Sequence, residues 1–111
     1  MEEISYGDFK KLDIRVGRVL FAERVPNSEK LYKVSIDSGL DRPRQTVTSL
    51  VDYYTAEELV GKTVVVLVNL APARMRGEVS ECMLLAAETP DSSACVLLTP
   101  EKDIAPGTPI V

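Results

Sequence analysis

Two arginines give this sequence its clearest chemical potential. Arg74 and Arg76 stand two positions apart in "NLAPARMRGEVSECM", residues 69–83, a stretch that proline and glycine interrupt and that we interpret as a loop. A guanidinium group matches phosphate oxygens with two parallel N–H donors, which an ammonium group cannot do. In an extended loop both side chains can face one side, so an anion-binding loop is one hypothesis. A solubilising charged loop and a structural salt bridge are the alternatives.

Catalytic and metal-binding constellations are missing from the sequence. It contains no histidine, which is the usual general base near neutral pH and the commonest metal ligand. The two cysteines, Cys82 and Cys95, lack CxxC spacing, so we interpret them as reduced thiols rather than as a disulfide or zinc ligands. No P-loop, GxGxxG or GxSxG motif occurs. We therefore predict that the protein is not an enzyme and has no cofactor and no metal.

Length and charge set further bounds. The 111 residues predict one domain, residues 1–111, with a single modest core. A net charge of −4 argues against indiscriminate nucleic-acid binding, so a local patch must hold any polyanion. The longest apolar run, residues 64–68, is too short to span a membrane, and the N-terminus lacks the basic and apolar regions of a secretory signal. We expect a cytoplasmic protein with no membrane partner.

The elements that must position the arginines follow from the apolar pattern. Alternation and β-branched residues predict strands at residues 12–25, 31–39, 45–51, 63–70, 82–88 and 94–100, with a last short β segment at 109–111. Gly17 within the first strand predicts a bulge or sharp coil. One helical turn is expected at residues 6–12 with Asp8 near its N-cap. Thr55 and Glu58 form a capping box for a second short helix, which Gly61 would end.

This order of elements is the order of the OB-fold. It predicts an all-β, five-stranded Greek-key barrel with one short helix between strands three and four, plus short terminal elements. An open sheet or a sandwich of short strands is the competing architecture.

An OB barrel binds oligonucleotides on its second and third strands and in the flanking loops. Lys33 and Arg44 fall on or beside these strands, and Lys30 and Arg42 fall in the adjoining loops. The chain has only six aromatic residues, most of which we expect to pack in the core or at its rim. A patch poor in exposed aromatics favours recognition of the shape of the phosphate backbone of a folded RNA over contacts with unstacked bases.

Three segments carry a resemblance to a known family. They are "KLDIRVGRVLFAERVPNSEKLYKVSID", "VDYYTAEELVGKTVVVLVNLAPARMRG" and "SECMLLAAE". The sequence resembles the tRNA-binding domain family, which includes the C-terminal domain of many methionyl-tRNA synthetases and free-standing structure-specific tRNA-binding proteins. It looks most like the free-standing bacterial form. The resemblance implies an OB-fold homodimer that recognises the shape of tRNA.

The resemblance also implies site residues. Lys30 matches the lysine of the family's D-K-L-Y turn, and Asn69 matches the asparagine that ends strand four. Where the family often has a lysine before the proline of the arginine loop, this chain has Ala71, and Glu81 adds an acid within the family's S-Q-G-M pattern. Together with the residues derived above, the candidate RNA-binding residues are Lys30, Lys33, Arg42, Arg44, Asn69, Arg74, Arg76, Ser80 and Met83.

The predicted partners are tRNA and a second copy of the chain, joined through the C-terminal tail and the N-terminal segment. An aminoacyl-tRNA synthetase is a further candidate partner. The alternative function is a protein-interaction module, either an accessory subunit of methionyl-tRNA synthetase or a CsaA-like export chaperone. The chain keeps the R-G-x-x-S-x-x-M pattern, as Arg76-Gly77, Ser80 and Met83, which the chaperone branch lacks; this favours RNA.

Overall fold

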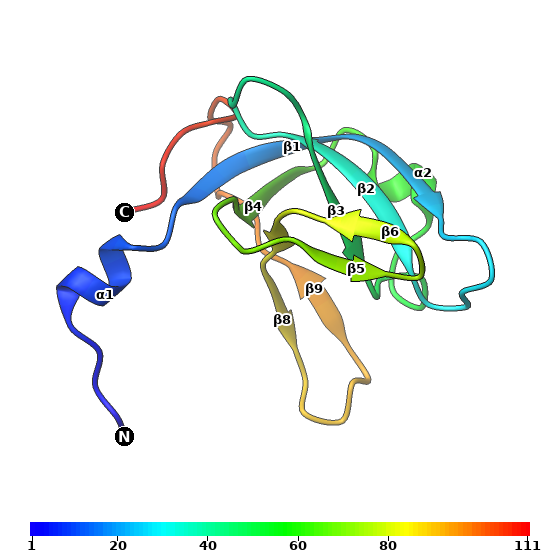
Figure 1. The fold of residues 1–111 in the computed structure, drawn as a ribbon, viewed down its shortest axis with the longest axis horizontal. Helices are drawn as coiled ribbons and strands as arrows, with labels where there is room; N and C mark the ends of the chain where they lie inside the picture. Colours follow the sequence, from blue (N-terminus) through cyan, green and yellow to red (C-terminus); the bar gives the residue numbers. More distant parts are fainter.

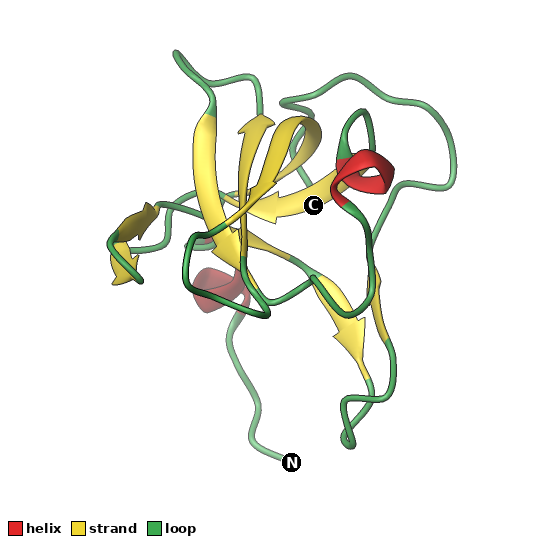
Figure 2. Cartoon of the chain, turned by 90° about the vertical axis from the view of Figure 1, so that its right-hand side faces the viewer, coloured by secondary structure: helices red, strands yellow, loops and turns green.

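Five antiparallel strands coil into a nearly closed barrel in the computed structural model, which describes residues 1–111 (Figure 1). The strands are β1 (Ile14–Arg24), β2 (Tyr32–Asp37), β3 (Arg44–Thr48), β4 (Thr63–Leu67) and β7 (Met83–Leu84). They lie in the order β3-β2-β1-β4-β7, and helix α2 (Ala56–Leu59) lies between β3 and β4 in the chain. Figure 2 shows the strands curling around a common interior with α2 beside them. The predicted OB-type barrel is confirmed.

The barrel interior is filled by the predicted alternating residues. Tyr32, Val34 and Ile36 of β2 point inward and are at most 4 % exposed. Residues 64–66 of β4 are all buried, so both faces of this strand are covered. Twelve buried residues form one continuous cluster, so the domain has a single core.

Both helices are short and begin at side-chain caps. In α2, Thr55 accepts from the Glu58 N–H and Glu58 accepts from the Thr55 N–H, so the predicted capping box is confirmed. Helix α1 (Tyr6–Lys10) begins one residue after its cap, Ser5, whose hydroxyl accepts from the Asp8 N–H at 3.0 Å. The prediction that Asp8 is the cap was wrong, because the serine three residues earlier has that position. No helix has the length and apolar character needed to cross a lipid bilayer.

The irregularity of β1 lies three residues beyond its predicted place. The register with β2 shifts between Val19 and Phe21, so the bulge is not at Gly17. Gly17 instead allows close packing, because a Cβ atom there would lie 2.7 Å from Cγ2 of Ile36 and 3.2 Å from Cγ1 of Val66. The absence of a side chain at Gly17 therefore leaves room inside the barrel for two core side chains from the neighbouring strands.

Two hairpins extend the barrel. The stretch interpreted as a loop forms β5 (Ala73–Met75) and β6 (Glu78–Ser80), joined by a two-residue turn with φ of +52° at Arg76 and +82° at Gly77. Positive φ at both positions is the geometry that matches the twist of a hairpin. The strand expected at 82–88 is split: β7 pairs with β4, whereas β8 (Ala86–Glu88) pairs with β9 (Cys95–Leu97) in a separate hairpin.

The C-terminal tail lies along β1 of its own chain. The N–H of Val16 donates to the carbonyl of Thr108 at 2.9 Å, and the N–H of Ile110 donates to the carbonyl of Ile14 at 2.8 Å. The expected β segment is thus reduced to one bridge between Arg15 and Pro109. The N–H of Gly107 also donates to the carbonyl of Val16 at 2.8 Å, so one edge of the tail is paired within its own chain.

Substitution Gly17→Ala tests whether the close packing at Gly17 of β1 requires glycine. The added methyl group must push Ile36 or Val66 aside, and overpacking of this kind costs about 1–3 kcal/mol of the free energy of unfolding. Urea unfolding of both proteins measures the difference. Gly7→Ala is the control, because the nearest atom to a Cβ there is 3.6 Å away. Equal stability of Gly17→Ala and the parent would contradict the packing argument.

Candidate nucleic-acid interface

Side chains complete the barrel where backbone pairing stops. The free edge of β3 faces the end of β6, and only one backbone hydrogen bond crosses this gap, from the N–H of Glu81 to the carbonyl of Gln45 at 2.8 Å. The hydroxyl of Ser80 accepts from the N–H of Val47 at 3.1 Å, and a carboxylate oxygen of Glu81 accepts from the N–H of Gln45 at 3.1 Å. We call these contacts the seam. The seam fixes the β5–β6 hairpin beside β3.

Glu81 also forms the strongest ion pair of this region. Both nitrogens of the Arg42 fork donate to its carboxylate, at 2.7 and 3.0 Å. Hydrogen bonding from Arg42, helped by the N–H of Gln45, lowers the pKa of Glu81 from its ordinary value of 4.5 to about 2. The acid that departs from the family's S-Q-G-M pattern therefore has a structural role, and it occupies a guanidinium that was predicted to face RNA.

Most of the predicted cations have carboxylate partners. Lys33 lies between Glu23 of β1, at 2.9 Å, and Glu78 of β6, at 3.6 Å, and its hydrogen bond to Glu23 raises the pKa of Lys33. Two further predicted cations also have carboxylate partners: Lys30 pairs with Asp52 at 2.7 Å, and Arg44 pairs with Asp41 at 3.1 Å. The outer face of β2 and β3 is thus close to charge-neutral.

Arg74 and Arg76 differ from these residues, because neither makes an ion pair. Both side chains are exposed. Arg74 makes one long hydrogen bond, 3.5 Å, to the carbonyl of Gly77, and the Arg76 side chain makes none. This contact brings the Arg74 guanidinium to the turn that carries Arg76. The hairpin therefore presents two uncompensated positive charges at one place outside the barrel.

Arg76 also meets the loop between β1 and β2. Together with Lys30 and residues 27–29 and 31, it lines an open hollow of about 480 Å³. Arg24, at the end of β1, donates to the carbonyls of Ser28 and Glu29 in the same loop and has no carboxylate partner. Sequence reasoning missed Arg24, although it stands just before the turn cluster that contains Lys30. The structure brings Arg76 and Lys30 together and adds Arg24 beside them.

The remaining predicted residues serve the fold at least in part. Asn69 links the start of β1 to the end of β4, because its side chain accepts from the Asp13 N–H and donates to the Lys11 carbonyl. Ser80 belongs to the seam. Met83, 48 % exposed, lines an apolar cavity of about 370 Å³ between the two hairpins.

The tyrosines next to these strands are used in packing, as expected. The hydroxyl of Tyr32 donates to the carbonyl of Tyr54 at 2.7 Å, and the Tyr54 hydroxyl accepts from the N–H of Leu97. Tyr53 donates to the carbonyl of Ser92 at the tip of the β8–β9 hairpin, at 2.6 Å. These bonds hold the second hairpin against the barrel, and they leave these rings poorly placed to stack on bases.

Comparison with known families agrees with the fold and with the resemblance seen in the sequence. Residues 14–109 match the family model described as a tRNA binding domain. Among curated proteins, the chain is 59 % identical over 107 residues to a methionine–tRNA ligase of Archaeoglobus fulgidus and 53 % identical over 111 residues to that of Methanosarcina acetivorans. The alignments cover 96 % and 99 % of this chain but only 16 % and 15 % of the ligases.

Solved structures with the same fold include free-standing chains. A MetRS-related protein from Pyrococcus horikoshii superposes with a TM-score of 0.91 at 33 % identity, over the full length of both chains. The chaperone CsaA from Bacillus anthracis superposes with a TM-score of 0.87 at 32 % identity and covers 99 % of this chain and 100 % of its own.

Removal of the Glu81 charge tests the seam. Because the folded-state pKa is lowered, the ionised carboxylate stabilises the fold fully above about pH 4.5, and this contribution disappears as the pH falls towards 2. Glu81→Gln should cost about 1–3 kcal/mol of the free energy of unfolding at pH 7, and the loss of stability below pH 4.5 should be smaller than in the parent. Denaturant unfolding at several pH values measures both effects.

Glu101→Gln is the matched control, because Glu101 is exposed and makes no ion pair. Equal unfolding curves for the parent and Glu81→Gln across this pH range would mean that the seam does not depend on this carboxylate.

Proposed function

Because the chain belongs to the tRNA-binding domain family, we propose that it is a non-catalytic protein that binds tRNA through the phosphates of the folded RNA. The observation that carries the proposal is the pair of arginines on the β5–β6 hairpin, exposed and free of carboxylate partners in a chain of net charge −4. Planar guanidinium forks at a hairpin turn suit phosphate oxygens. An acidic chain can bind a polyanion only where its cations are not compensated internally.

The proposed binding surface is the end of the molecule where the arginine hairpin meets the β1–β2 loop (Figure 1). Arg74 and Arg76 are the primary phosphate contacts, and Arg24, which also lacks a carboxylate partner, adds a cation beside the hollow that Arg76 lines. Lys30, Lys33, Arg42 and Arg44 would reach phosphate only by exchanging a carboxylate partner, so their net contribution is small. In this proposal Asn69 and Ser80 position the surface, and Met83 contacts the RNA from the cavity.

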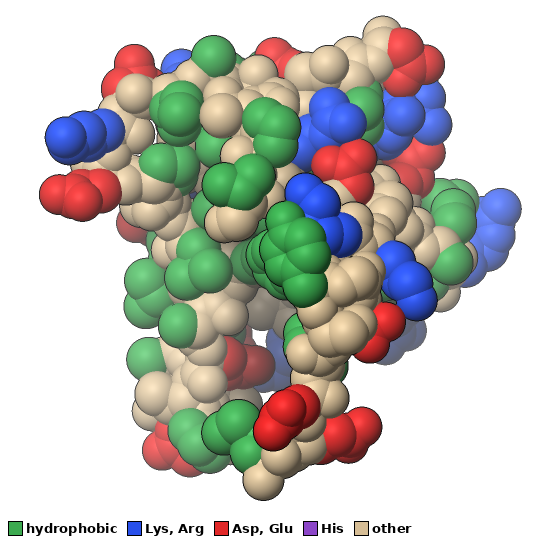
Figure 3. Space-filling model, turned by 90° about the vertical axis from the view of Figure 1, so that its left-hand side faces the viewer, with side chains coloured by type: hydrophobic (Ala, Val, Ile, Leu, Met, Phe, Trp, Pro, Cys, Tyr) green, Lys and Arg blue, Asp and Glu red, His purple; other side chains and the backbone are tan.

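A second copy of the chain completes the proposed binding unit. Helix α1 has five residues and buries none of them, and helices of this length are not stable alone in water. Ile4, Tyr6 and Leu12 are 69, 73 and 45 % exposed. The C-terminus lies on the same side of the molecule, and apolar side chains are spread over much of this face (Figure 3). Contact between two such faces would cover α1 and double the basic surface.

The alternative, a protein-interaction module, predicts a different outcome. An accessory subunit of methionyl-tRNA synthetase, or an export chaperone like the CsaA relative, would retain a protein rather than RNA on purification. Absorbance at 260 nm of the purified protein, with identification of any retained polypeptide, separates the two functions.

Charge reversal of the hairpin tests the proposed function. Arg74→Glu combined with Arg76→Glu should abolish the gel shift of bulk tRNA while leaving the unfolding transition cooperative, because neither side chain supports the core. Each single Arg→Gln variant should lower the slope of log affinity against log salt by about one, the value for one lost phosphate contact.

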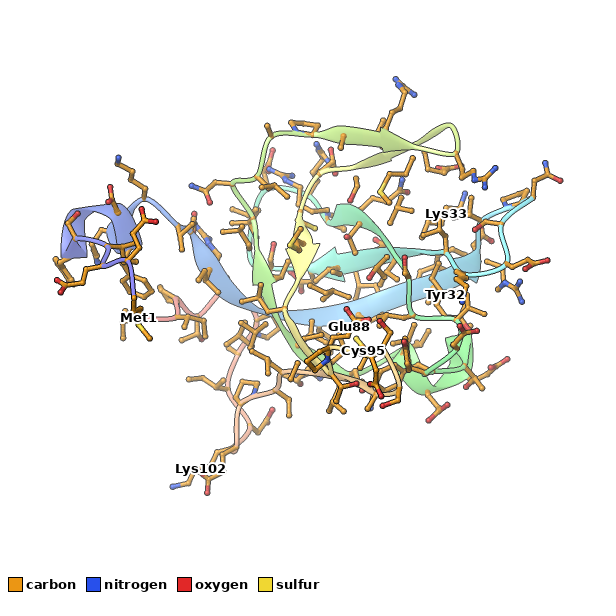
Figure 4. All side chains as sticks on the ribbon, turned by 90° about the horizontal axis from the view of Figure 1, so that it is seen from below. Met1, Tyr32, Lys33, Glu88, Cys95 and Lys102 are labelled. Atoms are coloured by element: carbon orange, nitrogen blue, oxygen red, sulfur yellow. The ribbon has the colours of Figure 1, made fainter.

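Lys102→Glu is the control for these variants, because Lys102 is exposed, unpaired and distant from the hairpin (Figure 4). Retained binding by the double variant, or an affinity that does not change with salt, would overturn the proposal.

Light scattering tests the proposed dimer. The parent should have the mass of two chains, and Tyr6→Glu with Leu12→Glu should give single chains with weaker tRNA binding, because like charges replace the apolar contact. The control pair is Val60→Glu with Val96→Glu, two exposed apolar residues elsewhere on the chain. A monomeric parent, or an equal effect of both pairs, would contradict this interface.

A further inference from the structure

An apolar cavity lies between the two hairpins and beside the proposed phosphate-binding surface. It has a volume of about 370 Å³ and extends from the free edge of β3 to the β8–β9 hairpin, with residues of β5 and β7 along its walls. Cavities of about 300–1,000 Å³ are typical of small-ligand sites. Met83 and Leu70 are 48 and 40 % exposed at this cavity, so its apolar wall is open to solvent.

Sulfur atoms are concentrated in this wall. Met75, Met83, Cys82 and Cys95 all line the cavity, so every sulfur-containing residue of the chain except Met1 is there. Burial raises the pKa of the Cys82 thiol to about 11, so the thiol stays neutral and behaves as an apolar surface. Thioethers and thiols make favourable contacts with aromatic rings, yet no aromatic side chain lines this cavity. The wall therefore suits an aromatic ring that the chain does not supply.

Polar groups at the cavity restrict the kind of ring. Glu88 of β8, opposite Cys95 of β9, lines the cavity with an exposed carboxylate that makes no ion pair. Figure 4 shows these two residues side by side. Thr48 and Ser49 contribute hydroxyl groups on the β3 side. A carboxylate accepts hydrogen bonds from the exocyclic amino group of cytosine, and uracil has no such group.

We propose that this cavity binds one unstacked nucleobase of the RNA, with a preference for a base that carries an amino group. The inference rests on the proposed function and extends it from phosphate shape to a base contact. Ala73 and Met75 line the cavity from β5, and Arg74 lies between them in the strand. Neighbouring residues of a strand point to opposite faces, so Met75 faces the cavity and Arg74 lies on the outer face of the same strand. An RNA strand that places one base against Met75 can therefore bring the phosphate of a neighbouring nucleotide to Arg74. A phenylalanine side chain of a peptide has no hydrogen-bond donor to offer the Glu88 carboxylate.

Methionine methyl groups report directly on this site. The 111-residue chain, labelled with ¹³C in its methionine methyl groups, gives three signals, which single Met→Leu variants assign. Addition of CMP should shift the signals of Met75 and Met83 upfield, because the ring current of a stacked base acts on nearby methyl groups. Met1 is the internal control, because it lies at the far end of the molecule (Figure 4). Bulk tRNA should give the same two shifts.

Glu88→Ala tests the choice of base. The parent should bind CMP about tenfold more tightly than UMP, since a hydrogen bond to a charged group supplies a difference of this size. Glu88→Ala should remove the preference, and Glu101→Ala should keep it.

The outcomes separate the two proposals. A tRNA gel shift without any change at Met75 and Met83 would overturn the base site and leave the proposed function intact. Shifts with CMP but no binding of tRNA would overturn the proposed function and keep the base site. Shifts with a phenylalanine-containing peptide but with none of the nucleotides would overturn the base site in favour of a peptide site.

Discussion

The closure of the barrel at the free edge of β3 is the constraint on which the other features depend. Strand β7 has two residues, too few to close the sheet with a regular ladder, so Ser80 and Glu81 satisfy N–H groups of β3 with side-chain oxygens instead. Buried backbone groups need such partners. The same two residues end the β5–β6 hairpin, so satisfying β3 also fixes where the arginine turn lies. Fold and candidate site thus share one set of hydrogen bonds.

Compensation of charge explains how an acidic chain can still present a basic surface. Ion pairs between exposed groups contribute little to stability, but they cancel the local potential that a polyanion would experience. Glu23 and Glu78 do this at Lys33, and Glu81 does it at Arg42. In the arginine hairpin the one acid, Glu78, pairs with Lys33, so neither Arg74 nor Arg76 has a carboxylate partner. The positive potential at the hairpin turn therefore arises because Arg74 and Arg76 have no carboxylate partners, and it does not require an excess of cations in the chain. For this reason net charge alone is a poor guide to the binding properties of this chain.

The sequence predicted most of the fold, because the apolar alternation of β2 and the capping box of α2 are local signals. It failed where the deciding contact is distant. Gly17 makes room for Ile36 and Val66, which no pattern around residue 17 reveals. Arg76 and Gly77 form a hairpin turn, although arginine is not a residue that normally marks positive φ. Likewise, spacing identified the cations of the candidate site. Asp41 lies only three residues before Arg44, but the carboxylates that neutralise the other three paired cations come from other strands and loops, and for these there was no local signal.

The placement of α1 has a consequence for how such a domain can be carried. The N-terminal segment and the arginine hairpin lie at opposite ends of the longest dimension, which is 41 Å (Figure 1). A polypeptide tethered before Met1 would leave from the side away from the arginines and would not have to cross them. A domain of this shape can therefore be fused through its N-terminus to different proteins, or function without a fusion partner, while its ligand-binding end stays accessible. Tethering would then change only the local concentration of the ligand near its host.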